Sequence, residues 1–264
     1  MRTHSIGVDV GDLRLPIKEA IRRAAEFEVQ SVEIPTVSGE TSPSQLSSSG
    51  RRHLVRYVEG LGLNIAALVA DMPALRLTDS GTVDERVART CEIINLAVDL
   101  KVRIVTASVG ALTHPQTGDP SGPALEALRR IGEYADGRGL VYAIRPSRDT
   151  GGRIVRILDE LRCPSIQIGL DPAAMVMSGV DPISAVERLA NTVGLFHVRD
   201  ATAGLAERPG QEKQLGEGDV DFAGILSHLE SAAYRGHFIV RRLDSSQPVA
   251  DIHSALEIIT SWNL

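Results

Sequence analysis

The chain has 264 residues, a formal net charge of −6, a hydrophobic fraction of 43% and a charged fraction of 23%. This composition is typical of a folded globular protein, and the negative charge excludes a summed positive field for nucleic acid or an anionic membrane. The sequence shows neither an apolar signal core nor a run of roughly 18 apolar residues. We therefore expect a cytoplasmic protein without nucleic-acid or membrane partners.

Short β-rich runs alternate with amphipathic helical patterns from one end of the chain to the other. Eight strand-then-helix units in a chain of this length predict an α/β protein, a (β/α)₈ TIM barrel that forms a single domain over residues 1–264. An open, doubly wound parallel sheet is the alternative. The candidate strands are residues 4–10, 31–36, 64–71, 103–110, 140–146, 165–171, 193–200 and 237–244.

The connections that follow the predicted strands are longer than those that precede them. Long segments such as 110–122 and 201–219 follow strands, whereas the segment 138–140 before the fifth strand is short. In TIM barrels the strand-to-helix loops build the active site, at the carboxyl ends of the strands. We therefore expect the functional site at that end of the barrel.

Alternation along the strands places four ionisable side chains together at this mouth. They are Arg145, Asp171, His197 and Arg241. A Gly-rich phosphate loop follows none of the strands, which disfavours nucleotide binding. None of the three lysines ends a strand, which disfavours a Schiff-base aldolase.

Four stretches give the sequence a more specific resemblance to the xylose isomerase-like TIM barrels. They are SVEIPT (31–36) with SPSQLSSSGRRHLVRYVEGLGLNIAAL (42–68), GLDPAAMVMSGVDPISAVERL (169–189), VGLFHVRDA (193–201) and LGEGDVDFAGILSHLESAAYRGHFIV (215–240). That superfamily includes sugar and sugar-phosphate isomerases and epimerases. The resemblance runs from the second to the eighth predicted strand and is sharpest in HVRDA and LGEGDVDF.

The resemblance implies a divalent metal (Mn, Mg, Zn or Co) held by Glu, Asp, His and Glu on strands five to eight. This sequence has Asp171 and His197 at two of these positions, but Arg145 and Arg241 stand at the glutamate positions. Exchanging two glutamates for two arginines changes the formal charge by about +4, which repels a divalent cation. We predict a degenerate metal site with no cofactor, in which Asp171 and His197 are vestigial ligands. A metal is expected only if another carboxylate completes a rearranged site.

Two interpretations of the arginines stay open. In the first, Arg145 and Arg241 form a pocket for a carboxylate or phosphate. In the second, they form salt bridges with Asp171 or Asp200 that close the mouth. Glu33 either faces the mouth or forms an interior ion pair, and His114 either reaches the mouth or lies in a solvated loop.

We therefore predict a sugar-phosphate isomerase- or epimerase-like barrel that lacks the standard metal-dependent activity and binds an anionic sugar derivative. The alternatives are an active isomerase with a rearranged metal site and a non-catalytic interaction barrel, so the sequence leaves open whether the chain is an enzyme. Its size and class are compatible with a homodimer. The catalytic candidates are His197 and Asp171, and the substrate-binding candidates are Arg145, Arg241, His114 and Glu33.

Overall fold

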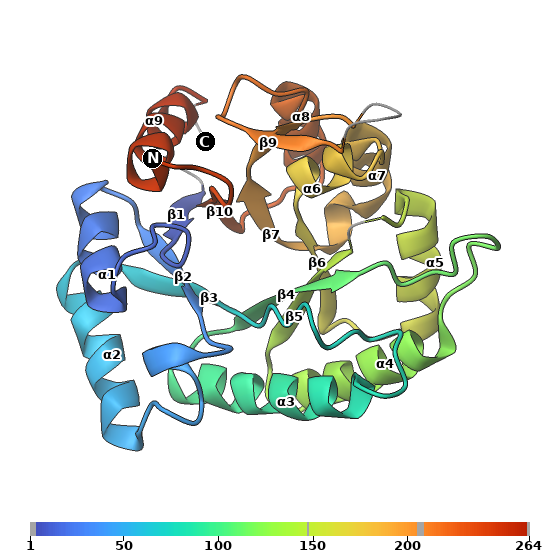
Figure 1. Cartoon of the computed structure of the whole chain (residues 1–264), viewed down its shortest axis with the longest axis horizontal. Coiled ribbons are helices and arrows are strands. Elements are labelled where there is room, and N and C mark those ends of the chain that lie inside the picture. Colours follow the sequence, from blue (N-terminus) through green and yellow to red (C-terminus); the bar gives the residue numbers. More distant parts are fainter. Residues whose placement is uncertain (1–3, 147, 205–208, 263–264) are drawn as a thin grey trace.

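Eight parallel strands close into a barrel with helices packed around it, as Figure 1 shows. The structure is a computed structural model and describes residues 4–146, 148–204 and 209–262. The order around the barrel follows the chain from β1 to β7 and closes through β10 between β7 and β1. The predicted (β/α)₈ fold is confirmed, and the open-sheet alternative is excluded. The prediction that residues 1–264 form one domain stays a prediction.

Each barrel strand is short and lies within a predicted range. The eighth strand ends at Val240, so Arg241 and the three residues after it leave the sheet. The barrel strands are β1 (Ser5–Asp9), β2 (Ser31–Pro35), β3 (Asn64–Val69), β4 (Ile104–Gly110), β5 (Val141–Pro146), β6 (Ile166–Leu170), β7 (Val193–Val198) and β10 (His237–Val240).

The helices bury an apolar stripe against the outside of the barrel, as in α1, where Ala20, Ile21 and Ala24 are buried. Two short 3₁₀ helices, η1 (Gly39–Thr41) and η2 (Ala190–Thr192), lie in connections. The α-helices of the described residues are α1 (Ile17–Glu26), α2 (Ser48–Gly60), α3 (Val83–Asp99), α4 (Gly122–Asp136), α5 (Gly151–Leu161), α6 (Pro172–Met177), α7 (Pro182–Leu189), α8 (Phe222–Ser231) and α9 (Pro248–Thr260). None of them is long and apolar enough to cross a membrane.

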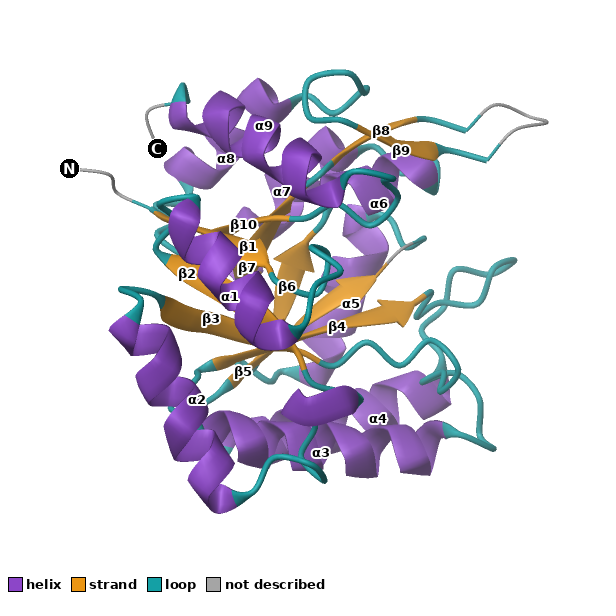
Figure 2. Cartoon of the chain, turned by 60° about the vertical axis from the view of Figure 1, so that its left-hand side comes forward, coloured by secondary structure: helices purple, strands orange, loops and turns teal. Residues whose placement is uncertain are grey.

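The seventh predicted strand, 193–200, is divided in the structure. It ends at Val198, and β8 (Asp200–Thr202) then pairs antiparallel with β9 (Gln211–Lys213) in a separate hairpin beside α6 (Figure 2). The Asp200 carboxylate explains the break, because it accepts hydrogen bonds from the backbone N–H groups of Ala201, Gly216, Gly218 and Val220. This side chain therefore organises the loop before α8 instead of extending the barrel strand.

The axis of the barrel is packed with small and apolar side chains below its mouth. Ala66, Ala67, Leu195 and Ile239 form a separate apolar cluster there. Ionisable side chains begin one layer higher, where Asp9 of β1 lies in register with Glu33 of β2. The fold thus places a polar layer directly on an apolar floor.

Candidate functional site

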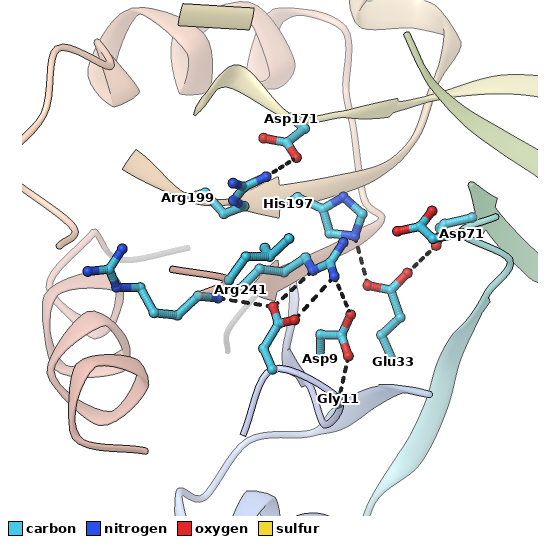
Figure 3. Close-up of polar contacts among 12 residues, drawn as sticks. Asp9, Gly11, Glu33, Asp71, Asp171, His197, Arg199 and Arg241 are labelled. Atoms are coloured by element: carbon cyan, nitrogen blue, oxygen red, sulfur yellow. Dashed lines mark hydrogen bonds and ion pairs between the residues drawn. The ribbon is translucent and has the colours of Figure 1, made fainter. Parts of the chain in front are cut away.

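The carboxyl ends of the strands bring five of the six predicted site residues together. Figure 3 shows that Asp171, His197, Arg241 and Glu33 lie around one mouth, and Arg145 joins them through Asp71. Arg145 and His197 belong to strands β5 and β7, whereas Asp171 and Arg241 follow β6 and β10 directly. The predicted convergence of Arg145, Asp171, His197 and Arg241 is therefore what the structure shows.

Arg241 is 7% exposed and lies between two carboxylates of the first βα unit. Its Nη2 lies 2.8 Å from Asp9 Oδ2, and its Nε lies 3.1 Å from Asp12 Oδ2 (Figure 3). Asp12 also accepts the backbone N–H of Arg242 at 3.0 Å. The guanidinium group thus fastens the last strand to the loop that follows the first.

Arg145 is 5% exposed and reaches in the other direction, toward β3. Its Nη2 lies 2.5 Å from both carboxylate oxygens of Asp71, which also accepts the backbone N–H of Ser108 at 2.6 Å. Gly169 makes room for this side chain, because a Cβ at that position would lie 2.9 Å from Arg145 Cγ. Nη1 of Arg145 is buried and has no hydrogen-bond partner among the described residues.

Arg199, which was not among the predicted site residues, holds Asp171. Its Nη1 lies 2.8 Å from Asp171 Oδ2 and its Nε lies 2.9 Å from Glu212 Oε1 of the β8–β9 hairpin. The other oxygen of Asp171 accepts the N–H of Ala174, which caps α6. Glu212 in turn accepts the backbone N–H groups of Leu243 and Asp244. These contacts tie the hairpin to the mouth.

His197 and Glu33 form a fully buried pair across the barrel, with 0% exposure on both side chains. His197 Nε2 lies 2.7 Å from Glu33 Oε2, and the other Glu33 oxygen accepts the hydroxyl of Thr106. His197 Nδ1 has no partner among the described residues. Of the two arrangements that the sequence left open for Glu33, the structure thus shows the interior pair, with His197 as the partner.

The electrostatics of the mouth follow from burial and from the neighbouring guanidinium groups. Burial alone would raise the pKa of Glu33, but His197, Arg241 and Arg145 outweigh it, so that pKa lies well below its usual range. Burial lowers the pKa of His197, and Arg145 and Arg241 lower it further. Glu33 acts in the opposite direction but does not outweigh them. A neutral imidazole that donates Nε2–H to an ionised Glu33 agrees with the lowered pKa of each residue.

The two aspartates of the mouth respond to burial differently. Burial opposes the ionisation of Asp171, but Arg199, the N–H of Ala174 and Arg145 hold its pKa at about 2. Burial raises the pKa of Asp9 well above its usual range against the pull of Arg241, and the carboxylates of Asp12 and Glu33 add to the rise. Burial lowers the pKa of Arg241, but the carboxylates of Asp9, Asp12 and Glu33 raise it by more. Arg241 therefore keeps its charge despite its burial.

The donor groups of the mouth are engaged with other groups of the protein. Asp171 uses its oxygens for Arg199 and Ala174, and His197 uses Nε2 for Glu33. Across the residues that the structure describes, no three His, Cys, Asp or Glu side chains are grouped as metal ligands. Arg145 and Arg241 separate the remaining carboxylates, and guanidinium groups repel a cation and donate no lone pair.

The sixth predicted residue, His114, lies apart from this mouth. It is exposed in the loop between β4 and α4 and lines a cavity of about 620 Å³ with its neighbours in the segment 111–122 and with Thr78 of the loop after β3. Its backbone N–H and C=O bond to Asp119 and Gly118. The structure therefore places His114 in a surface loop, the other arrangement that the sequence had left open.

Sequence reasoning missed the carboxylates that hold the arginines. The expected partners were Asp171 and Asp200, whereas Asp71, Asp9 and Asp12 are found. A signal was present, because Asp9 and Asp71 stand near the ends of the first and third predicted strands, as Asp171 does at the sixth. Arg199 and Glu212 gave a weaker signal, since their contact depends on the β8–β9 hairpin.

The model of the family described as Xylose isomerase-like TIM barrel matches residues 21–262 of this chain. The chain is 24% identical over 284 residues to the putative L-ribulose-5-phosphate 3-epimerase SgbU of Escherichia coli (strain K12), a match that covers 97% of this chain and 95% of that protein. It is 23% identical over 133 residues to inosose dehydratase of Geobacillus thermodenitrificans (strain NG80-2). That match covers 44% of this chain and less than half, 45%, of the dehydratase.

Solved structures share the fold at low identity. The xylose isomerase domain protein from Planctomyces limnophilus matches with a TM-score of 0.81 and 21% identity, over 91% of each chain. A xylose isomerase-like TIM barrel protein from Mycobacterium smegmatis, solved in complex with magnesium, matches with a TM-score of 0.76 and 15% identity, over 99% of this chain and 97% of that one. Some structures with this fold thus contain a metal.

Proposed function

Because the chain belongs to the xylose isomerase-like TIM-barrel family, we propose that it is a metal-independent member that binds a small, anionic, sugar-like molecule. In this proposal it does not carry out metal-dependent sugar isomerisation. The barrel and its mouth are those of a sugar isomerase and epimerase family, and the guanidinium groups of Arg145 and Arg241 supply fixed positive charge in place of the ion.

The observation that carries the proposal is the pairing of these two arginines. Each is buried and bound to carboxylates of β1, β3 or their loops, so each guanidinium charge is compensated within the protein. A guanidinium group donates hydrogen bonds but has no coordination site, and it therefore cannot bind a carbonyl and a hydroxyl oxygen together as a Lewis acid. The glutamates that would move a proton between carbons are also replaced.

The ligand class follows from composition and relatives together. The relatives named above include a sugar-phosphate epimerase, which favours a sugar-like molecule for this chain as well. Aromatic residues make up only 3% of the chain, and its one tryptophan, Trp262, packs on Phe222 of α8. A neutral sugar would lack the aromatic faces on which sugar rings commonly stack, whereas an anionic group suits an arginine-rich chain.

The burial of His197, Glu33 and Asp171 favours positioning roles over direct contact with a ligand. His197 and Glu33 are inaccessible in the barrel, and Asp171 is committed to Arg199 and to the start of α6. We propose that these three residues hold the mouth in shape. The catalytic roles predicted for His197 and Asp171 stay predictions.

Metal analysis tests the metal-independent part directly. Protein purified without chelator is expected to contain less than stoichiometric divalent metal, and its melting temperature is expected not to change with EDTA or Mn²⁺. The double variant Arg145→Glu/Arg241→Glu restores the carboxylates that the resemblance implies, and we expect Mn²⁺ to stabilise it. A stoichiometric metal in the wild type would overturn the proposal.

Ligand screening tests the second part. Sugar phosphates and sugar acids are expected to raise the melting temperature, whereas the corresponding neutral sugars leave it unchanged. A ligand at about 100 times its Kd adds about 2.7 kcal/mol to the free energy of unfolding, which a thermal melt resolves. Stabilisation by neutral sugars alone would contradict the anionic preference.

A further inference from the structure

A second group of arginines surrounds a cavity beside the mouth. The cavity has a volume of about 420 Å³ and lies between the loop that follows β3, the end of β4 and the loop that follows β5. Arg76, Arg86 and Arg148 line it, together with the hydroxyl-bearing Thr78 and Ser108. Among the described residues, the lining contains no aspartate or glutamate. Its volume is in the range of small-molecule sites.

Arg86 is the buried member of this group, with 2% exposure in the first turn of α3. Its Nη1 donates to the carbonyl oxygens of Met72 (2.8 Å) and Leu75 (3.2 Å), and its Nη2 donates to that of Ser108 (3.0 Å). Its Nε is buried with no hydrogen-bond partner, and within the described ranges it has no carboxylate partner. Burial of a cation without a counter-charge is costly, which makes an anion in the cavity favourable.

Arg76 and Arg148 approach the cavity from the two flanking loops and are exposed. Neither forms an ion pair with another described residue, in contrast to Arg130, which pairs with Asp84 at 2.6 Å, although other exposed arginines such as Arg52 and Arg188 are also unpaired within the described residues. The carboxylates nearest to these two arginines along the chain have other partners: Asp79 accepts hydrogen bonds from Gly81 and Thr82, and Asp149 accepts them from Leu112 and Thr113. The three cations therefore face the cavity without compensation.

We propose that this cavity is the anion-binding site of the protein. In it the buried Arg86 supplies a fixed positive charge, and the exposed Arg76 and Arg148 bind the anion from the two loops. The ligand group is an oxyanion, a phosphate or a carboxylate, carried by a small sugar-like molecule, because guanidinium groups match the geometry of both. The inference rests on the proposed preference for anionic ligands and adds its location. It separates the site from the mouth, where Arg145 and Arg241 already have carboxylate partners.

Calorimetry and thermal melts at low salt test the site with inorganic phosphate, glucose 6-phosphate, gluconate and, as the neutral control, glucose. The test variant is Arg76→Gln/Arg148→Gln, which changes only exposed side chains, and the matched control is Arg188→Gln on the exposed face of α7. We expect the test variant to bind the anions at least about tenfold more weakly, since each charge-assisted hydrogen bond contributes on that order. The control variant should bind as the wild type does. Tighter binding of the phosphates than of gluconate would identify a phosphate site, and the reverse order a carboxylate site.

The outcomes separate this inference from the proposed function. Anion binding that survives in the test variant but is lost in Arg145→Gln would overturn the location and leave the anionic preference standing. If the wild type binds no anion, both the location and the preference for anionic ligands are overturned. The metal analysis would still test separately whether the protein is independent of a metal. Because Arg86 is buried, its role is read from Arg86→Lys, which retains the charge and is expected to retain more binding than Arg86→Gln at equal melting temperature.

Discussion

Two groups of arginines lie at the same end of the barrel and differ in what they contact. The mouth arginines, Arg145, Arg199 and Arg241, all bind carboxylates. The cavity arginines, Arg76, Arg86 and Arg148, have no carboxylate partner among the residues described, and Arg86 reaches only backbone carbonyls. Arginine side chains are thus neutralised by carboxylates at the mouth, whereas at the cavity they keep an uncompensated positive charge. An arginine therefore indicates an anionic ligand only where no carboxylate of the protein already pairs with it.

The largest expected effect comes from removing a mouth arginine. Arg241→Met leaves Asp9 and Asp12 as buried carboxylates without their cation, which we expect to cost about 3–5 kcal/mol in the free energy of unfolding. Urea unfolding at pH 7 measures it. The exposed Arg188→Met serves as the control and should change stability by less than about 0.5 kcal/mol. An equally small loss in Arg241→Met would mean that the mouth network is not coupled to folding.

Removing the buried cavity arginine should cost less. Arg86→Met leaves the carbonyl groups of Met72, Leu75 and Ser108 without a donor but strands no buried carboxylate, so we expect a loss of about 1–3 kcal/mol. The same urea series measures it, with and without phosphate. A cost equal to that of Arg241→Met would erase the proposed difference between the two groups.

The pH dependence tests the neutral histidine of the mouth. His197 has a lowered pKa in the folded protein, so the unfolded chain takes up its proton first as the pH falls. Its contribution to stability is therefore complete above about pH 6.5 and is lost below it, by up to about 1.4 kcal/mol per pH unit.

His197→Gln should flatten the fall in stability between about pH 6.5 and pH 5, measured by urea unfolding at several pH values. His4 and His237 also have pKa values lowered by burial, so part of the slope should remain in the variant. An unchanged slope would show that His197 carries a proton in both states.

The smallest effect concerns the space beside Arg145. Gly169→Ala would bring a Cβ within 2.9 Å of Arg145 Cγ, and we expect about 1 kcal/mol of destabilisation as the side chain shifts from Asp71. Gly152→Ala is the matched control, because a Cβ there meets nothing within 4 Å in α5. That variant should be stabilised by up to about 1 kcal/mol. Thermal melts of both variants should therefore move in opposite directions.

Much of the fold could be predicted because the barrel repeats one local pattern. Each strand is a short apolar run followed by an amphipathic helix, and both periods are visible in the residues themselves. The boundary at Val198 could not be predicted, since it depends on the contact of Asp200 with residues 216–220. Long-range contacts of this kind leave no periodic signal.

The site was predictable in position but not in pairing. Strand ends identify which side chains meet at the mouth: Asp171, His197 and Arg241 lie around it in Figure 3, and Arg145 joins them through Asp71. Which carboxylate each arginine chooses depends on side-chain reach across the barrel, as between Arg145 and Asp71. The cavity arginines were not predicted, because Arg76 and Arg148 lie in loops and Arg86 on a helix.

The loop organised by Asp200 changes what the family resemblance means. A side chain at Gly218 would lie 2.1 Å from Asp200 Oδ1, so the aspartate of HVRDA and the second glycine of LGEGD constrain each other as parts of one turn. The same HVRDA segment also carries His197 and Arg199, which contact Glu33 and Asp171 at the mouth. The most recognisable signature of this sequence therefore reports the shape of a loop as well as the placement of two mouth side chains.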